Sequence, residues 1–163
     1  MIMEKIFAPW RMAYIKNDKP EGCIFCKNSI RCDDLILFEG KTAFIIMNRY
    51  PYTNGHLMVS PLRHISHMED LQPAEKLEIF DLQVICIKVL KEAVMPDGFN
   101  IGVNLGKAAG AGVDDHMHVH IVPRWSGDTG FISVVGDLRV IPEDIHKTYK
   151  LLQPYFKKYR QEV

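Results

Sequence analysis

Histidine alternates with apolar residues along positions 116–120, which read His-Met-His-Val-His, and Ile121 and Val122 follow. In a β-strand, residues i, i+2 and i+4 point to one face, so this alternation predicts a strand with three imidazoles on the same face. Three adjacent titratable rings add little to stability, whereas neutral imidazole binds metals and acts as a base or nucleophile near pH 7. We interpret the strand as the centre of a functional site. The alternative is a histidine-rich strand that is merely exposed or binds metal incidentally.

The composition is that of an ordinary globular protein and limits the classes of partner. The chain has 163 residues, 47% of them hydrophobic and 25% charged, which suits one domain with a substantial core. Its formal net charge is zero, so we expect no nucleic-acid partner, and a phosphate-bearing ligand has to be held locally. No apolar run approaches the roughly 20 residues of a membrane span, and no secretory leader is evident. We therefore expect a cytoplasmic protein without membrane contact.

Hydrophobic periodicity predicts one α+β domain over residues 1–163, with a mostly antiparallel sheet. An irregular segment is expected at 1–22 and strands at 35–39, 43–47, 56–60, 99–105 and 116–123. One helix is expected to open at Pro73 and to end before Pro96, and a second to cover about 143–160. The apolar face predicted for the first helix comprises Leu77, Phe80, Val84, Ile87, Leu90 and Val94. That of the second comprises Ile145, Tyr149, Leu152 and Phe156.

Two cysteines separated by two residues, Cys23 and Cys26, indicate half of a metal site or a redox pair. Two unrelated thiols are the third interpretation. A closed tetrahedral zinc site needs four nitrogen or sulfur ligands. His64 and His116 are candidates to complete it, which would leave the other two histidines of the 116–120 strand for catalysis.

Further candidates lie around the predicted strands. The loop 106–112, Gly-Lys-Ala-Ala-Gly-Ala-Gly, leads into the histidines, and the backbone amides of glycine-rich loops can bind phosphate. A simple flexible connection is the alternative. His56 opens a predicted strand, and Asn48 and Asn104 each lie at the end of one, where polar side chains can reach a ligand. Ordinary strand capping or turn formation would explain the same residues.

The order and spacing of these motifs resemble the histidine triad family, whose signature is His-x-His-x-His followed by apolar residues. The matching segments are 23–26, 54–59, 61–64, 104–106 and 116–122, and the likeness covers residues 8–125. The resemblance implies an α+β fold with a five-stranded antiparallel sheet and two main helices, paired as a homodimer. It also implies nucleotide binding and catalysis at the α-phosphate of a nucleotide.

Roles for individual residues follow from motif position in that family. The resemblance implies that His118 is the nucleophile and that His120 and His56 hold and polarise phosphate oxygens. Asn104 would contact the phosphate region, and Asn48 would face the ribose.

The resemblance also bears on the cysteine pair. Zinc-containing members of the family bind a structural zinc ion through the C-x-x-C pair, the histidine after the Pro-x-x segment and the first triad histidine. In this sequence these positions are Cys23, Cys26, His64 and His116.

One position departs from the family pattern. Many members carry glutamine four residues before the first triad histidine, where this chain has Gly112. The loop therefore offers backbone donors, and we take Gly110, Gly112 and Val113 as substrate contacts. A different acceptor or leaving group is then plausible. Segments 8–11, 109–112 and 123–125 are similar to the branch that contains bacterial diadenosine tetraphosphate phosphorylases.

The leading functional hypothesis is nucleotidyl transfer through a histidine-bound intermediate. With inorganic phosphate as acceptor, diadenosine tetraphosphate would yield ADP and ATP. With water, the protein would hydrolyse dinucleoside polyphosphates or nucleotide phosphoramidates. A nucleotide-binding signalling protein is the third possibility, which the intact His118 and His56 disfavour. Aromatic and basic pairs at 10–11 and 124–125 either contact the substrate or serve packing.

Overall fold

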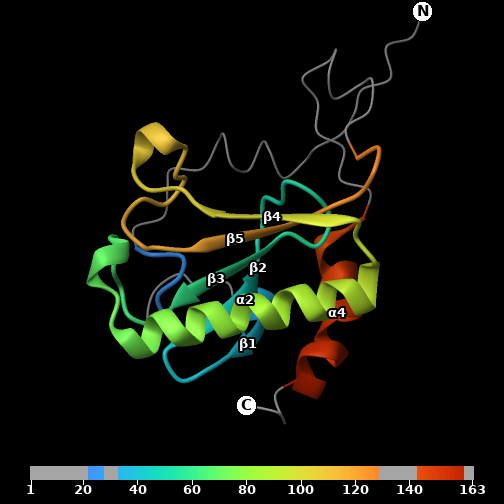
Figure 1. Cartoon of the computed structure of the whole chain (residues 1–163), viewed down its shortest axis with the longest axis horizontal. Coiled ribbons are helices and arrows are strands. Elements are labelled where there is room, and N and C mark those ends of the chain that lie inside the picture. The colour runs from blue at the N-terminus through green and yellow to red at the C-terminus, as the bar shows by residue number, and fades with distance from the viewer. Residues whose placement is uncertain (1–21, 28–32, 129–142, 160–163) are drawn as a thin grey trace, which may run out of the picture.

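A five-stranded antiparallel sheet forms the centre of the computed structural model, which describes residues 22–27, 33–128 and 143–159 (Figure 1). Its strands are β1 (Ile36–Glu39), β2 (Ala43–Met47), β3 (Leu57–Pro61), β4 (Gly98–Val103) and β5 (Val119–Arg124). Their order is β1-β2-β3-β5-β4, and every neighbouring pair is antiparallel. The α+β class and the five strands expected from the sequence are confirmed.

The position of each strand in the sheet follows from its burial. β2 and β3 are buried along their whole length and occupy the interior of the sheet, where β-branched and apolar side chains are covered on both faces. β5 pairs with β3 on one side and β4 on the other, and β4 is the outermost strand of that side. Of the residues expected to form the site, His56 precedes β3, His118 leads into β5 and His120 lies on β5. Cys23 and Cys26 precede β1, and His64 follows β3.

In the part of the chain that the structure describes, two long helices accompany the sheet (Figure 1). Helix α2 (Pro73–Val94) connects β3 to β4 and packs against β2, β3 and β5. Helix α4 (Ile145–Tyr159) packs against α2 and β1. The predicted apolar face of α4 is confirmed, because Leu152 and Phe156 are fully buried and Ile145 and Tyr149 pack against the core.

The apolar face predicted for α2 is wrong for its first half, whereas Leu90 is buried and Val94 packs against the core as predicted. Leu77 and Phe80 are 65% and 64% exposed, and the helix buries a different face there. That face carries the apolar residues Ile79, Leu82, Ile85, Cys86, Val89 and Leu90.

Two acidic side chains explain the error. Glu75 accepts hydrogen bonds from Arg63, and Glu78 accepts the backbone amides of Lys41 and Ala43 in the β1–β2 turn. Both carboxylates lie on the sheet side of α2. A search for apolar periodicity alone therefore selects the other stripe of the helix.

The predicted strand at 116–123 begins later than expected. β5 starts at Val119, so His116 and His118 precede it. The backbone amide of Met117 donates to the carbonyl of Ile65, and the Ser60 hydroxyl donates to the carbonyl of Met117. These bonds take the place of strand pairing and hold the segment in an irregular form.

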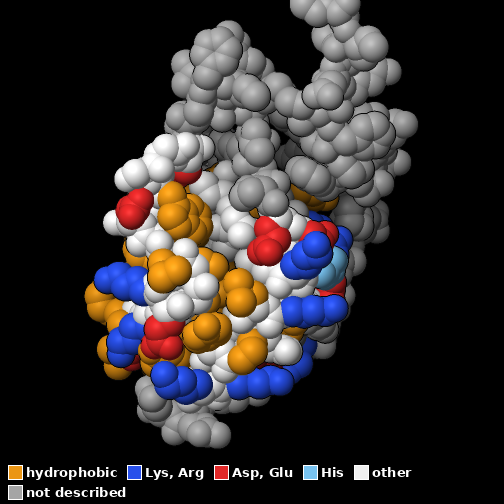
Figure 2. Space-filling model, turned by 90° about the vertical axis from the view of Figure 1, so that its right-hand side faces the viewer, with side chains coloured by type: hydrophobic (Ala, Val, Ile, Leu, Met, Phe, Trp, Pro, Cys, Tyr) orange, Lys and Arg blue, Asp and Glu red, His pale blue; other side chains and the backbone are white. Residues whose placement is uncertain are grey.

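The surface shows no continuous apolar belt on the face drawn in Figure 2, where small groups of hydrophobic side chains are bordered by Lys and Arg. Within the described residues, neither helix is long and apolar enough to cross a membrane. The sequence expectations for the segments 1–21, 129–142 and 160–163, including the pair at 10–11, lie outside the described residues.

Candidate functional site

The backbone between His116 and His118 is held by the segment that leaves β3. Met117 donates its amide to the Ile65 carbonyl at 2.7 Å and accepts the Ser60 hydroxyl at 2.9 Å. Both Met117 and Ser60 are buried, so these hydrogen bonds are shielded from water. The segment is thereby fixed on both sides of one residue, and the side chains of its two neighbours are placed with it.

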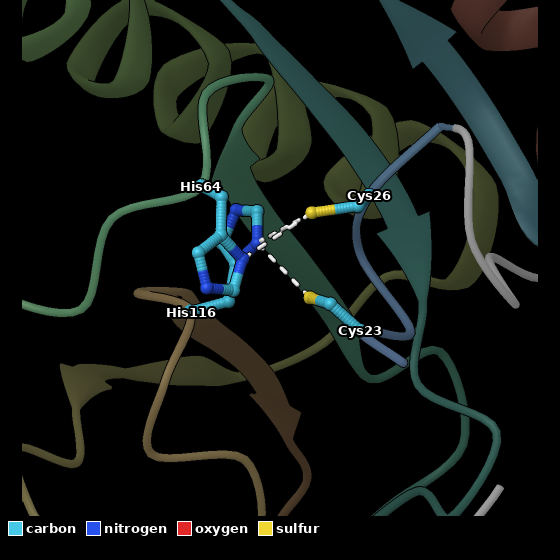
Figure 3. Close-up of side chains that lie close together, drawn as sticks. All are labelled: Cys23, Cys26, His64 and His116. Atoms are coloured by element: carbon cyan, nitrogen blue, oxygen red, sulfur yellow. Dashed lines mark hydrogen bonds between the residues drawn. The ribbon is translucent and has the colours of Figure 1, made fainter. Parts of the chain in front are cut away.

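Four side chains converge at one end of this segment: Cys23, Cys26, His64 and His116 (Figure 3). Their ligand atoms all lie within 4.8 Å of one another. The Nδ1 atom of His116 lies 3.2 Å from the Cys23 sulfur and 3.6 Å from the Cys26 sulfur. The Nδ1 atom of His64 lies 3.3 Å from the Cys26 sulfur. The structure thus brings together all four residues predicted as metal ligands, and the cluster could hold a metal ion.

The protonation of His116 suits that role. Its Nε2 lies 3.0 Å from the carbonyl oxygen of Pro61, which can only accept a hydrogen bond, so Nε2 carries the proton. Nδ1 is then left with a lone pair that faces the two thiols. Metal-binding histidines commonly donate their other ring N–H to a carbonyl in this way. Burial lowers the pKa of His116, which favours the neutral ring that a ligand needs.

His118 is oriented by the same backbone. Its Nδ1 lies 2.9 Å from the carbonyl oxygen of His116, so Nδ1 carries the proton and the lone pair lies on Nε2. The side chain is buried, and this burial lowers its pKa. The ring is therefore neutral near pH 7 and has an unprotonated nitrogen, as a nucleophile requires.

A second pair of histidines lies beside it. The backbone amide of Tyr52 donates to Nδ1 of His56 at 3.1 Å, so the proton of the neutral His56 ring is on Nε2. That Nε2 lies 3.0 Å from Nδ1 of His120 and donates to it. His120 therefore carries its own proton on Nε2, where it can donate to an anion. Asn48 also contacts Nδ1 of His56, at 3.2 Å, through its side-chain amide.

The histidines lie on the face of the sheet away from α2. Val119 lines a groove beside α2, and strand alternation then directs His118 and His120 to the opposite face. Across the ladder, His120 is paired with Met58 on β3 and Gly102 on β4. A Cβ at Gly102 would meet no atom within 4 Å, so the space next to His120 is open.

The other predicted substrate contacts flank this face. Asn104 follows β4 and is half-buried, while Gly110 and Gly112 lie in an exposed loop. The amides of Ala109, Gly110 and Ala111 donate to carbonyls within the loop. Because these three amides are already bonded within the loop, the prediction of backbone donors for a ligand now centres on the amides of Gly112 and of Val113, the residue after the loop. The roles of Asn104, Gly110, Gly112 and Val113 in substrate binding stay predictions.

Sequence reasoning missed two residues whose rings touch the histidines and one, Ser60, that bonds to the backbone between two of them. The ring of Phe25 lies 4.7 Å from that of His118, and the ring of Tyr52 lies 4.7 Å from that of His56. Ser60 fixes the backbone, as described above. An aromatic residue between the two cysteines was a signal available in the sequence for Phe25, whereas nothing in the local pattern distinguishes Ser60.

Comparison with known proteins identifies a family and relatives of this chain. Residues 31–127 match the family described as "HIT domain". A Mycobacterium tuberculosis protein named AP-4-A phosphorylase is 37% identical over 161 residues, which span 92% of this chain and 83% of the relative. The asymmetrical bis(5'-nucleosyl)-tetraphosphatase of Schizosaccharomyces pombe is 31% identical over 93 residues, 57% of this chain and 50% of that protein.

One solved structure is similar to this chain over most of the length of both proteins. A zinc-bound histidine triad family protein from Mycobacterium smegmatis superposes with a TM-score of 0.64 at 27% sequence identity. The match covers 79% of this chain and 88% of that protein. The similarity thus extends from the sequence motifs to the arrangement of the sheet that carries them.

The buried His120 is expected to make stability depend on pH. Burial, aided by the nearby His118, lowers the pKa of His120 to about 4, against 6.5 for an ordinary histidine. Between those values the unfolded chain binds a proton that the folded chain does not, so stability rises with pH through this window. Replacing His120→Asn should remove about 1 kcal/mol of the stability difference between pH 7 and pH 5.

Urea unfolding at the two pH values measures that difference. The exposed His67→Asn serves as the control and should retain the difference seen in the wild type. If both variants lose the same part of the pH-dependent stability difference, or if His120→Asn loses none of it, His120 is not its source.

Proposed function

This chain belongs to the HIT domain family, and on that premise we propose that it is an enzyme that transfers a nucleotidyl group from a dinucleoside polyphosphate through His118. The observation that carries the proposal is the orientation of His118, whose proton is committed to the His116 carbonyl. A buried, neutral imidazole with its lone pair on Nε2 is suited to attack at phosphorus.

In the first step, the Nε2 lone pair of His118 forms a bond to the α-phosphorus of the substrate. The bond from that phosphorus to the bridging oxygen breaks, and the oxygen leaves with the electron pair as part of a nucleotide. With diadenosine tetraphosphate, the products of this step are adenylyl-histidine and ATP. The proton on Nδ1 stays shared with the His116 carbonyl, which stabilises the positive charge that the ring acquires.

His120 and His56 would stabilise the phosphate oxygens during this step. Preorganised donors directed at developing charge lower a barrier most when they need no reorganisation. The Tyr52 amide donates to His56, and His56 donates to Nδ1 of His120, so the proton of the neutral His120 ring is on Nε2. Neutral rings provide these donors without the repulsion that three clustered positive charges would cause. We propose that Asn48 holds His56 in this tautomer and lies near the ribose.

In the second step, an acceptor attacks the nucleotidyl-histidine and restores His118. We propose inorganic phosphate as the acceptor, so that the adenylyl group leaves as ADP. The support is the 37% identity, over 92% of this chain, to a protein named AP-4-A phosphorylase. The 31% identity to a tetraphosphatase supports hydrolysis, with water as the acceptor, as the second candidate.

We further propose that the Cys23, Cys26, His64 and His116 cluster binds a structural zinc ion. A tetrahedral zinc ion with ordinary Zn–S and Zn–N bonds spaces its ligand atoms about 3.3–3.8 Å apart. The sulfur–nitrogen distances of 3.2, 3.3 and 3.6 Å are close to that range. Two thiolates and two imidazoles are a donor set that zinc prefers, and the zinc-bound relative from M. smegmatis adds support. Reduced thiols suit a cytoplasmic location.

We also propose that the protein is a homodimer formed through α2 and β4. A groove of about 670 Å³ lies between these elements, lined by Phe80 and Ile79 of α2 and by Ile101 of β4. Four of its lining residues are exposed large apolar side chains: Met68, Phe80, Ile101 and Leu105. An apolar patch next to an outer strand is typical of a protein–protein interface.

Products formed from diadenosine tetraphosphate test the activity. With phosphate present we expect equal amounts of ADP and ATP, and without phosphate no turnover. His118→Ala should lower kcat by about 10³-fold or more while the protein stays folded, because the nucleophile is lost. The exposed His67→Ala is the control. AMP and ATP, or two ADP, formed without phosphate would favour the hydrolase, and wild-type activity in His118→Ala would exclude this nucleophile.

Metal analysis of the purified protein tests the zinc site. We expect about one zinc ion per chain, and removal by a chelator should lower Tm by about 10 °C, because the ion stabilises only the folded chain. Cys26→Ser should lose the metal, whereas Cys86→Ala should keep it, since Cys86 is buried on α2 and is not one of the four clustered residues. Folded wild-type protein without metal and with an unchanged Tm would refute the proposal.

The mass in solution tests the dimer. Wild-type protein should have twice the chain mass of 18.7 kDa by light scattering, and Phe80→Glu should have the chain mass, because a carboxylate would be buried in the apolar interface. Leu151→Glu, an exposed position on α4, should stay dimeric. A monomeric wild type at micromolar concentration, or dissociation of both variants, would argue against this interface.

A further inference from the structure

Phe25 lies between the two cysteines of the C-x-x-C segment, yet its side chain points away from solvent and is 1% exposed. Its backbone amide donates to the Cys23 sulfur at 3.4 Å. Its ring lies 4.7 Å from the His118 ring at an interplanar angle of 30°, and 5.4 Å from the His116 ring. One side chain of the cluster's own loop therefore contacts both the metal-ligand histidine and the proposed nucleophile.

The plane of the His118 ring needs such a contact. The hydrogen bond at Nδ1 fixes one atom of the ring, but the χ2 torsion of histidine is broad and does not by itself define a plane. The Phe25 ring is tilted by 30° relative to the His118 ring, and the His120 ring lies 4.8 Å away at 81°, edge to face. The imidazole is thus bounded by two aromatic rings at a large angle to each other.

We propose that Phe25 is a positioning residue that holds the His118 imidazole with Nδ1 on the His116 carbonyl and Nε2 directed at the substrate. The purpose of this orientation rests on the function proposed above, whereas the orientation itself does not. A flat ring packed 4.7 Å from the imidazole at a 30° tilt restricts the imidazole plane, and an aliphatic side chain of similar size would fill the space without that restriction. The near-complete burial of Phe25 argues against a role in stacking on a nucleobase.

The same contact connects the metal cluster to the nucleophile. Phe25 is attached to the backbone between Cys23 and Cys26, so whatever holds the two sulfur atoms also places its ring. Metal bound by the cluster would therefore maintain His118 by two routes, through the His116 carbonyl and through the Phe25 ring. Loss of the metal should disturb His118 in the same way as loss of the ring.

The test compares two buried phenylalanines in the zinc-loaded protein. Phe25→Leu removes the ring next to His118, and Phe25→Met fills the same space with a flexible chain. Phe44→Leu is the matched control, because Phe44 on β2 is equally buried and its ring lies 6.5 Å from that of Phe25. Zinc content and the unfolding midpoint are measured for every variant.

The first measurement needs no substrate. Long-range ¹H–¹⁵N spectra of the histidine rings report which nitrogen carries the proton, and the His118 signals are assigned by their absence in His118→Asn. In the wild type and in Phe44→Leu we expect a single form protonated at Nδ1. In Phe25→Leu, in Phe25→Met and in wild-type protein treated with chelator, we expect a mixture of the two neutral forms, because an unrestrained imidazole can carry its proton on either nitrogen.

The second measurement is turnover of diadenosine tetraphosphate with phosphate. For Phe25→Leu we expect kcat to fall about 10–100-fold with KM changed less than about twofold, since misplacement of the reacting atom affects the chemical step. Phe44→Leu should keep kcat within about twofold of the wild type. If the wild type does not turn this substrate over, the proposed function fails and the spectra alone decide the role of Phe25.

Three results would overturn the proposal. One is an unchanged His118 spectrum in both folded Phe25 variants. Another is the same change in Phe44→Leu, which would show a general effect of core disruption. The third is a shifted His118 tautomer with kcat equal to that of the wild type, which would separate the orientation of the ring from catalysis.

Discussion

The site depends on how the backbone around Met117 is fixed to the segment that follows β3. The Ile65 carbonyl and the Ser60 hydroxyl each bond to Met117, and the Pro61 carbonyl accepts from the His116 ring. These bonds take the place of sheet pairing in a segment that would otherwise extend β5. The residues on either side of Met117 are the proposed metal ligand His116 and the proposed nucleophile His118. One set of buried hydrogen bonds therefore positions both. Stability of this segment and chemistry at the site are therefore inseparable.

Backbone groups, rather than charged side chains, determine the protonation of the histidines. A carbonyl oxygen can only accept and an amide can only donate, so the His116 carbonyl and the Tyr52 amide each select one tautomer of the ring that they contact. Because His56 carries its proton on Nε2, it donates to Nδ1 of His120, and the proton of His120 is then on Nε2. Burial keeps the rings neutral, and the three triad positions consequently present different atoms: a lone pair toward the thiols, a nucleophilic nitrogen, and a donor.

The sequence predicts the parts of this arrangement that depend on local periodicity. Alternation predicted one shared face for the histidines, and the structure directs His118 and His120 to the face away from α2. The spacing of Cys23 and Cys26 indicated a ligand pair that His64 and His116 complete in the fold. The exposed stripe of α2 was mistaken for its core face, because buried Glu75 and half-buried Glu78 bond to groups distant in sequence and leave no apolar signature. The late start of β5 has the same origin, since the partners of Met117 lie more than 50 residues away.

Under the proposed mechanism, the acceptor, phosphate or water, would enter through the open space next to His120. Gly102, directly opposite His120, and Gly112 in the preceding loop both lack a side chain, and a Cβ at either would meet nothing within 4 Å. Water can reach such a space without a binding site, whereas phosphate competes with water only if fixed donors hold it in line with the Nε2–phosphorus bond. Among the described residues, the donors that we propose for phosphate are the His120 Nε2–H, loop amides near Gly112 and the side chain of Asn104. Preference for phosphate would therefore come from how closely the loop approaches His120 when both substrates are bound, and not from a dedicated side chain at position 112.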